Sequence, residues 1–242
     1  MIDLAPWAWA LLALAAFNAG ISKTAIPGGA TVSVVILASV LPARTSTAAM
    51  LLLFIVGDVF ALIAYRRHAH WRTLLRLAPA VVAGLLLGFA FLALGNDAVV
   101  RRTIGVILLV MIGITLWRRR RSQRSHGPIA AASYGTLAGF TTMVANAGGP
   151  VMSMYFIATR TPVQVFLGTS AWFFAIVNLV KVPFLAGIGL VTPAVLWMDL
   201  LLAPLVVVGA LLGIRLAKRM PQRLFERIVI VLTIAGALYL LL

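Results

Sequence analysis

The sequence predicts an all-α, polytopic membrane protein built from two inverted repeats of about five membrane segments each. Three observations predict this class. The composition is 63% hydrophobic and only 10% charged, with a mean hydropathy of +1.10, whereas a soluble domain needs more charge on its surface. Several apolar stretches reach the roughly 17–25 residues that cross a hydrocarbon core as a helix. The two halves of the chain also match each other in order.

Apolar segments follow one another along the chain, five in each half. In the first half they span 6–22, 29–41, 47–65, 74–94 and 102–117, and in the second half 129–145, 150–158, 166–185, 193–214 and 228–242. The segments 29–41 and 150–158 are short for a crossing. Each is either a full crossing or a half-helix that forms a re-entrant hairpin with its predecessor, so the total is about eight to ten membrane segments. The first repeat, with a basic linker, covers 1–124, and the second covers 125–242.

Several simple features exclude other classes. Asp3 is the only charge before the first apolar segment, so this segment is predicted to be a membrane helix and not a cleaved signal. Cysteine is absent, and the three histidines lie in basic loops, so neither a disulfide, a metal nor a cofactor is expected. Period-two alternation is missing, which argues against a β-barrel.

The net charge of +15 does not point to nucleic acid. Fourteen of the 20 Lys and Arg residues lie in three short runs between apolar segments, at 66–76, 118–124 and 215–227. Such runs are typical of cytoplasmic loops. The bilayer therefore accounts for the charge, and nucleic-acid binding is not expected. The Arg- and Ala-rich composition favours a bacterial inner membrane.

Ordered identities indicate an internal duplication. Shifting the sequence by 120 positions pairs Gly28-Gly29 with Gly148-Gly149, Ser33 with Ser153, Pro42 with Pro162, Phe54 with Phe174 and Asp58 with Asn178. After a further five-residue slip, Ala78-Pro79 pairs with Ala203-Pro204, Gly84 with Gly209, Gly88 with Gly213 and Arg102 with Arg227. Matches at glycine, proline and polar positions are hard to obtain by chance in such a sequence.

The charges of equivalent loops indicate that the second copy is inverted. The loop 66–76 is basic, whereas its counterpart 186–191 has no charge. Conversely, the loop 94–100 carries a single acid, whereas its counterpart around 218–223 is basic. An odd number of segments per repeat places equivalent loops on opposite faces, as these charges require. Both termini are then expected outside the cytoplasm.

Two glycine-containing breaks, at 20–29 and 139–150, occupy equivalent positions in the repeats. Unwound backbone leaves N–H groups free where the next helix begins, and the positive end of that helix attracts anions. The alternative is that these glycines are ordinary turns or packing points. The hypothesis is a substrate site that includes Ser22, Lys23, Thr24, Gly28, Gly29, Asn146, Gly148 and Gly149.

Lys23, Asp58 and Lys181 are ionisable residues at membrane depth, which costs roughly 2.5–3.5 kcal/mol each on insertion scales. Lys181 follows Asn178 by three residues and shares its helix face. One interpretation is a structural ion pair between Asp58 and a lysine. The other is that Lys23 and Lys181 balance the charge of a substrate beside Asn178, while Asp58 carries a coupling proton. Asp199 is interpreted as an interfacial acid in the first turn of its helix.

The chain resembles the sulfite exporter TauE/SafE family, also called the toluene sulfonate uptake permeases, over nearly its whole length. The resemblance rests on the duplicated Gly-Gly breaks, on Pro42 and Pro162, and on the spacings Gly84/Gly88 and Gly209/Gly213, which are interpreted as helix-packing positions. The family's break commonly holds three consecutive glycines, and this chain departs from that pattern. The resemblance implies transport of a small sulfur-containing or organic anion, such as sulfite or a sulfonate.

The leading hypothesis is a secondary transporter for a small anion that alternates access around the two breaks near the membrane midplane. A nucleotide-binding Gly-x-x-x-x-Gly-Lys-Ser/Thr motif is absent from the sequence. The rival is a non-transporting scaffold or assembly subunit, which predicts dry packing at both breaks. An enzyme is not expected. The expected partners are a small anionic substrate and the lipid bilayer. The substrate, the direction, the coupling ion and the oligomeric state stay open, with a homodimer as one candidate.

Overall fold

The computed structural model describes residues 4–94, 128–221, 223, 224, 227, 228, 231 and 234. Within this part the chain forms α-helices and short 3-10 turns with no strand, which confirms the all-α prediction. The expected segment 102–117 lies outside the described residues, as does nearly all of 228–242.

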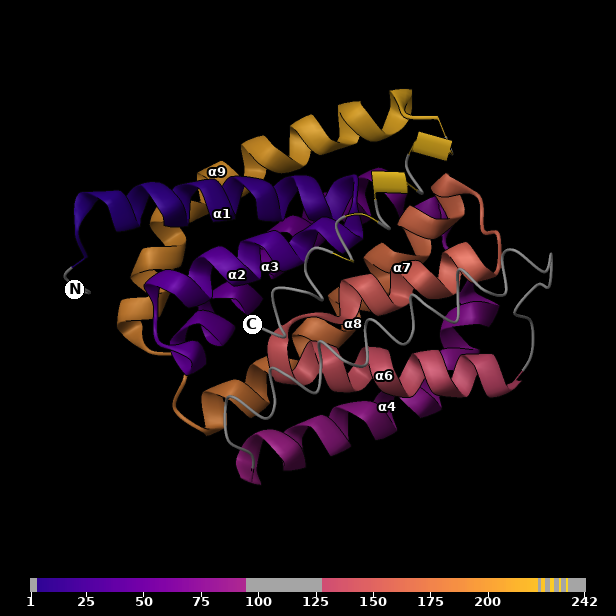
Figure 1. Ribbon diagram of the computed structural model, residues 1–242, viewed down its shortest axis with the longest axis horizontal. Coiled ribbons are helices and arrows are strands. Elements are labelled where there is room, and N and C mark those ends of the chain that lie inside the picture. Colours follow the sequence, from indigo (N-terminus) through magenta and orange to yellow (C-terminus); the bar gives the residue numbers. More distant parts are fainter. Residues whose placement is uncertain are drawn as a thin grey trace.

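The helices follow the predicted segments closely (Figure 1). In the first half they are α1 Pro6–Thr24, α2 Ala30–Val40, α3 Ala43–Tyr65 and α4 Trp71–Leu94, with 3-10 turns η1 Pro27–Gly29 and η2 Arg66–His68. In the second half they are α6 Pro128–Ala145, α7 Gly148–Ala158, α8 Val163–Gly187 and α9 Pro193–Arg219. Helices α3 and α8 begin earlier than predicted, directly after Pro42 and Pro162. The first turn of α3 is polar and that of α8 contains Gln164, so hydropathy alone placed both starts too late.

Four helical stretches are long and apolar enough to cross a membrane: Thr45–His68, Trp71–Phe91, Val163–Gly187 and Pro193–Arg219. Helices α2 and α7 have only 11 residues each. At 1.5 Å per residue they measure about 16 Å, roughly half of a hydrocarbon core. Asn18 on α1 donates hydrogen bonds to the Gly29 carbonyl at 3.1 Å and to Ser33 Oγ at 2.8 Å, so α2 folds back along α1. These lengths favour the re-entrant alternative for both short helices.

Glycines allow α1 and α9 to cross with their backbones in contact. A Cβ added at Gly20 would collide with the Val206 carbonyl oxygen, and one added at Gly209 would collide with the Phe17 carbonyl oxygen. Helices α4 and α6 cross in the same way, because a Cβ at Gly84 would meet the backbone of α6. The interpretation of these glycines as helix-packing positions is confirmed.

The two glycine-rich crossings join corresponding helices, α1 to α9 and α6 to α4. Within each pair the helices run in the same direction, since increasing positions on one meet increasing positions on the other. Figure 1 shows α1 and α9 beginning at the left, whereas α4 and α6 run from right to left. The first helices of the two halves therefore run in opposite directions, which is the arrangement that an inverted duplication produces.

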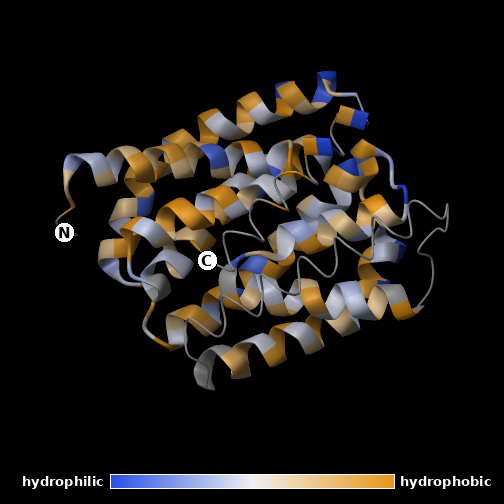
Figure 2. Ribbon diagram, viewed as in Figure 1, coloured by the Kyte–Doolittle hydropathy of each residue, from blue (hydrophilic) through white to orange (hydrophobic). Residues whose placement is uncertain are grey.

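Hydrophilic residues gather at one end of the helix bundle. Figure 2 shows blue segments concentrated at the right, opposite the N-terminus. Tyr65 and Leu74, on either side of the basic turn η2, share a buried hydrophobic cluster with Ala217 near the basic end of α9. Figure 1 shows α9 ending at the right, where α4 begins directly after η2, so the two basic loops on the described part of the chain lie at the same end of the bundle. The third basic run, at 118–124, is outside that part.

Candidate functional site

The two breaks lie against each other in the middle of the bundle. The 3-10 turn η1 forms the first break, and Asn146 and Ala147 form the second, between α6 and α7. Helix α7 contacts both η1 and α2. Equivalent interruptions of the two halves are therefore neighbours in space, although about 120 positions separate them in the sequence.

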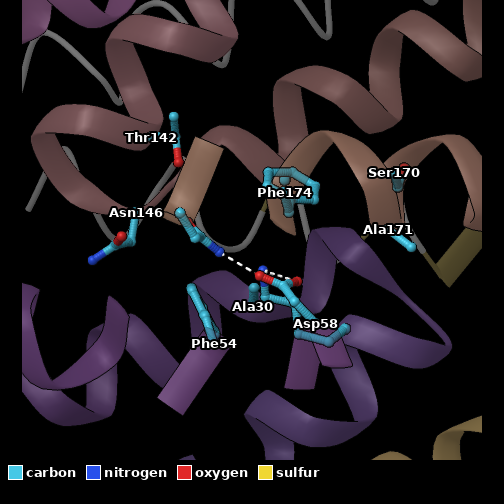
Figure 3. A pocket seen from close by; sticks show the side chains of 11 residues that line it. Ala30, Phe54, Asp58, Thr142, Asn146, Ser170, Ala171 and Phe174 are labelled. Carbon is cyan, nitrogen blue, oxygen red and sulfur yellow. Dashed lines mark hydrogen bonds and ion pairs between the residues drawn. The ribbon is translucent and has the colours of Figure 1, made fainter. Parts of the chain in front are cut away.

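A small pocket lies where the breaks meet helices α3 and α8. Its lining residues are Lys23, Ala30, Phe54, Asp58, Thr142, Asn146, Gly149, Ser170, Ala171, Phe174 and Asn178 (Figure 3). The space corresponds to about one water molecule. A polyatomic anion therefore requires the lining side chains to move before it enters.

Lys23 is the cation of this pocket. The structure places it in the last turn of α1 and not in the unwound break, where the sequence suggested it. Its Nζ lies 2.7 Å from Asp58 Oδ1. The same Nζ lies 4.5 Å from the Phe54 ring centroid and 4.6 Å from that of Phe174. Because Phe54 and Phe174 are counterparts in the two halves, the ammonium sits between equivalent aromatic rings.

Asp58 and Asn178 meet at the contact between α3 and α8. Asn178 Nδ2 donates to Asp58 Oδ2 at 2.6 Å, and both side chains are buried. These residues are counterparts in the internal alignment, so a direct contact between them lies near the axis that relates the halves. Asp58 is thus held by an ammonium on one oxygen and by an amide on the other.

Lys181 does not join this ion pair. Its Nζ donates to the Thr142 carbonyl oxygen at 2.6 Å and to Asn146 Oδ1. Asn146 has a φ of +52°, an uncommon value for a residue other than glycine, and its Nδ2 donates to the Thr47 carbonyl at 3.0 Å. Lys181 therefore lies beside the pocket, with Asn146 between the two.

The pocket contains only some of the residues that the sequence singled out. Lys23, Asp58, Asn146, Gly149 and Asn178 line it, whereas Ser22, Thr24, Gly28, Gly29, Gly148 and Lys181 do not. Thr24 serves helix packing, since its Oγ1 donates to the Gly20 carbonyl at 3.0 Å and to the Ala210 carbonyl on α9 at 2.9 Å. A Cβ at Gly148 would lie 2.8 Å from Thr142 Cβ, so this glycine permits close packing of α7 on α6.

Sequence reasoning missed Ser170 and the pocket role of the two phenylalanines. Ser170 Oγ is buried and has no hydrogen-bond partner within the described part. Nothing in the sequence distinguished Ser170, because Met50 occupies the equivalent position. The exact alignment of Phe54 with Phe174 in the two halves could have identified both residues as part of the site.

The interpretation of Asp199 as an interfacial acid in the first turn of its helix was wrong. Asp199 lies beyond the first turn of α9, is 7% exposed, and its carboxylate has no partner among the residues described.

An all-helical membrane bundle with a buried ion pair between two helix breaks is the architecture of a membrane transporter. The family model "Sulfite exporter TauE/SafE" matches residues 12–240, and the chain belongs to this family. The family is one of membrane transporters of sulfur-containing anions. A search of curated proteins and a search of solved structures found no match.

Proposed function

We propose that the protein is a secondary transporter of a small sulfur oxyanion, sulfite or a sulfonate, in the inner membrane. It alternates access around the two breaks. The observation that carries this proposal is the Lys23 ammonium, which is held in a pocket between the breaks by one carboxylate and two equivalent aromatic rings. Membership of the sulfite exporter family supports the substrate class.

Lys23 gives the pocket one positive charge, and Asp58 neutralises it at 2.7 Å. An anion that binds the Lys23 ammonium would lie close to the Asp58 carboxylate, and the repulsion between two such anions is costly in a medium of low dielectric. Substrate binding is therefore coupled to neutralisation of Asp58 by a proton. The substrate takes the place of the carboxylate on the ammonium, and Asn178 retains the neutral acid through its side-chain amide.

The remaining donors suit an oxyanion. The hydroxyls of Ser170 and Thr142 belong to the pocket lining, and the Ser170 hydroxyl has no other partner in the described part of the chain. Hydroxyl and ammonium groups are the donors that sulfur oxyanions accept from. Because the pocket holds about one water molecule, an oxyanion enters only after the lining side chains move, and a small one requires the least movement.

In this proposal the units that move in alternating access are pairs of crossed helices, each of which includes one helix from either side of the repeat boundary near residue 125. Backbone contact at the glycine crossings holds α1 to α9 and α6 to α4. Each crossing joins one helix from each half, and this close backbone packing favours movement of each pair as one unit. The buried polar contact between the halves lies between α3 and α8, where Asp58 and Asn178 meet, and protonation of Asp58 would act there.

Reconstituted transport tests the proposal. Proteoliposomes with the purified protein should take up labelled sulfite when a pH gradient is imposed, and Asp58→Asn should lose this pH-driven uptake while it still folds and binds sulfite. A scaffold subunit is the alternative that the paired charges and narrow pocket also fit. Absence of uptake of sulfite and sulfonates by folded wild-type protein, with either orientation of the gradient, would favour the scaffold.

A further inference from the structure

Lys181 is a buried basic residue that the transport proposal does not use. The residue lies on α8 and is fully buried. Its Nζ bonds to two oxygens at the C-terminal end of α6, the Thr142 carbonyl at 2.6 Å and Asn146 Oδ1. The Thr142 carbonyl also accepts the Asn146 N–H at 3.1 Å, and a carbonyl oxygen has two lone pairs for two such donors.

These oxygens form the kind of site that holds a small cation. A helix C-terminus carries about half a negative charge. In transporters with interrupted helices, unwound carbonyls and the C-terminal ends of half-helices coordinate Na⁺. Here α6 ends at Ala145, and the oxygens that surround the cation site belong to its last turn and to Asn146. The Lys181 ammonium is bound where a free cation would otherwise be attracted.

Asn146 fixes the geometry of this site. Its left-handed backbone ends α6, its Oδ1 accepts from Lys181, and its Nδ2 donates to Thr47 on α3. A single side chain thus links the ammonium, the second break and the opposite half of the chain. The internal alignment places Ala61 opposite Lys181 and Ile26 opposite Asn146, so the first break has no equivalent arrangement.

We propose that Lys181 is a tethered cation that replaces a bound metal cation at the α6–α7 break. It is a positioning residue: it keeps Asn146 and the end of α6 in place beside the pocket and does not touch the substrate. The protein therefore needs no sodium ion at this break. Removing the side chain should leave an empty cation site that a small ammonium ion can refill. The inference goes beyond the proposed function, because it concerns the break itself and not the substrate.

The test is the thermal stability of the purified full-length protein in different chloride salts at equal ionic strength. In Lys181→Ala, propylammonium matches the three methylenes and the ammonium that are lost. We expect Tm to fall in this variant and to rise again by several degrees, in a saturable way, with propylammonium but not with choline, which is too large. Lys181→Met fills the same space without charge, so its Tm should stay low in both salts.

Two results would overturn the proposal. One is a Lys181→Met variant that is as stable as the wild type and transports as fast, since the ammonium would then be dispensable. The other is a saturable rise of the wild-type Tm with NaCl over choline chloride that Asn146→Ala abolishes, because sodium would then bind at the break that Lys181 already occupies. The second measurement needs neither Lys181→Ala nor transport activity, so it is decisive even if Lys181→Ala fails to fold or if sulfite is not the substrate.

Discussion

Replacing Lys23 by methionine tests the anion site with the least change in shape. Methionine is the residue that the chain itself carries at the equivalent position, Met143. The substitution keeps an unbranched side chain between the Phe54 and Phe174 rings and removes only the charged end. It abolishes the ammonium that lies 2.7 Å from Asp58 Oδ1.

The expected loss of affinity follows from the contact that disappears. A hydrogen bond to a charged group contributes roughly 1.5–3 kcal/mol. At about 1.4 kcal/mol for each factor of ten, sulfite should bind roughly ten- to a hundredfold more weakly to Lys23→Met. The variant also leaves the Asp58 carboxylate buried with Asn178 as its remaining partner. Breaking a buried ion pair costs about 3–5 kcal/mol of stability, so Tm should fall as well.

The two effects are separated by a second variant. Lys23→Met combined with Asp58→Asn removes both buried charges, so the double variant should recover much of the lost stability but none of the lost affinity. Calorimetric titration of the purified proteins with sulfite measures affinity, and thermal unfolding measures stability. Lys218→Met is the matched control, because Lys218 is exposed in the last turn of α9 and should bind sulfite like the wild type. Wild-type affinity in a folded Lys23→Met protein would remove Lys23 from the site.

Three further predictions concern packing, topology and the substrate contacts. Gly84→Ala places a methyl group against the α6 backbone and should lower Tm markedly, whereas Gly187→Ala, with nothing within 4 Å, should not; equal Tm values would refute the backbone crossing. Since the chain has no cysteine, single cysteines that replace Arg67 and Lys218 can be labelled selectively. Both should react only from the cytoplasmic side, and a cysteine near the N-terminus should react only from the other side. Labelling of the first two from opposite sides would contradict the inverted arrangement. Ser170→Ala should weaken sulfite binding by about tenfold, the value of one good hydrogen bond to an anion, and unchanged affinity would exclude the hydroxyl from the site.

Much of the fold could be predicted because it depends on local sequence. Hydropathy located the helices to within a few residues, and glycine and proline located the breaks. The alignment of the halves also identified Asp58 and Asn178 as equivalent, and the structure adds that they are in contact. In an inverted duplication, two equivalent residues that lie near the pseudo-two-fold axis between the copies are also close to each other. Such a contact can therefore be predicted from the alignment of the two halves.

The partners of the buried polar groups could not be predicted in the same way. Thr24 was a candidate ligand, but its hydroxyl donates to the Ala210 carbonyl on α9, which is 186 positions away in the sequence. Lys181 shares a helix face with Asn178, yet its long side chain reaches the end of α6 and not Asp58. Which of several nearby oxygens a lysine selects depends on how helices pack and where a break ends. Neither of these is encoded by spacing along one helix.

In the proposed mechanism one ammonium, Lys23, is shared between Asp58 and the substrate, so that anion binding brings a proton to Asp58. The most direct test is to count the protons taken up when sulfite binds. Calorimetric titrations of purified protein in two buffers with different heats of ionisation give this number, and comparison with Asp58→Asn cancels the protons that belong to sulfite itself. The wild type should take up about one proton more per anion than Asp58→Asn, so its affinity should rise by up to about tenfold for each unit that the pH falls. An identical proton count in the two proteins, with sulfite bound to both, would contradict the claim.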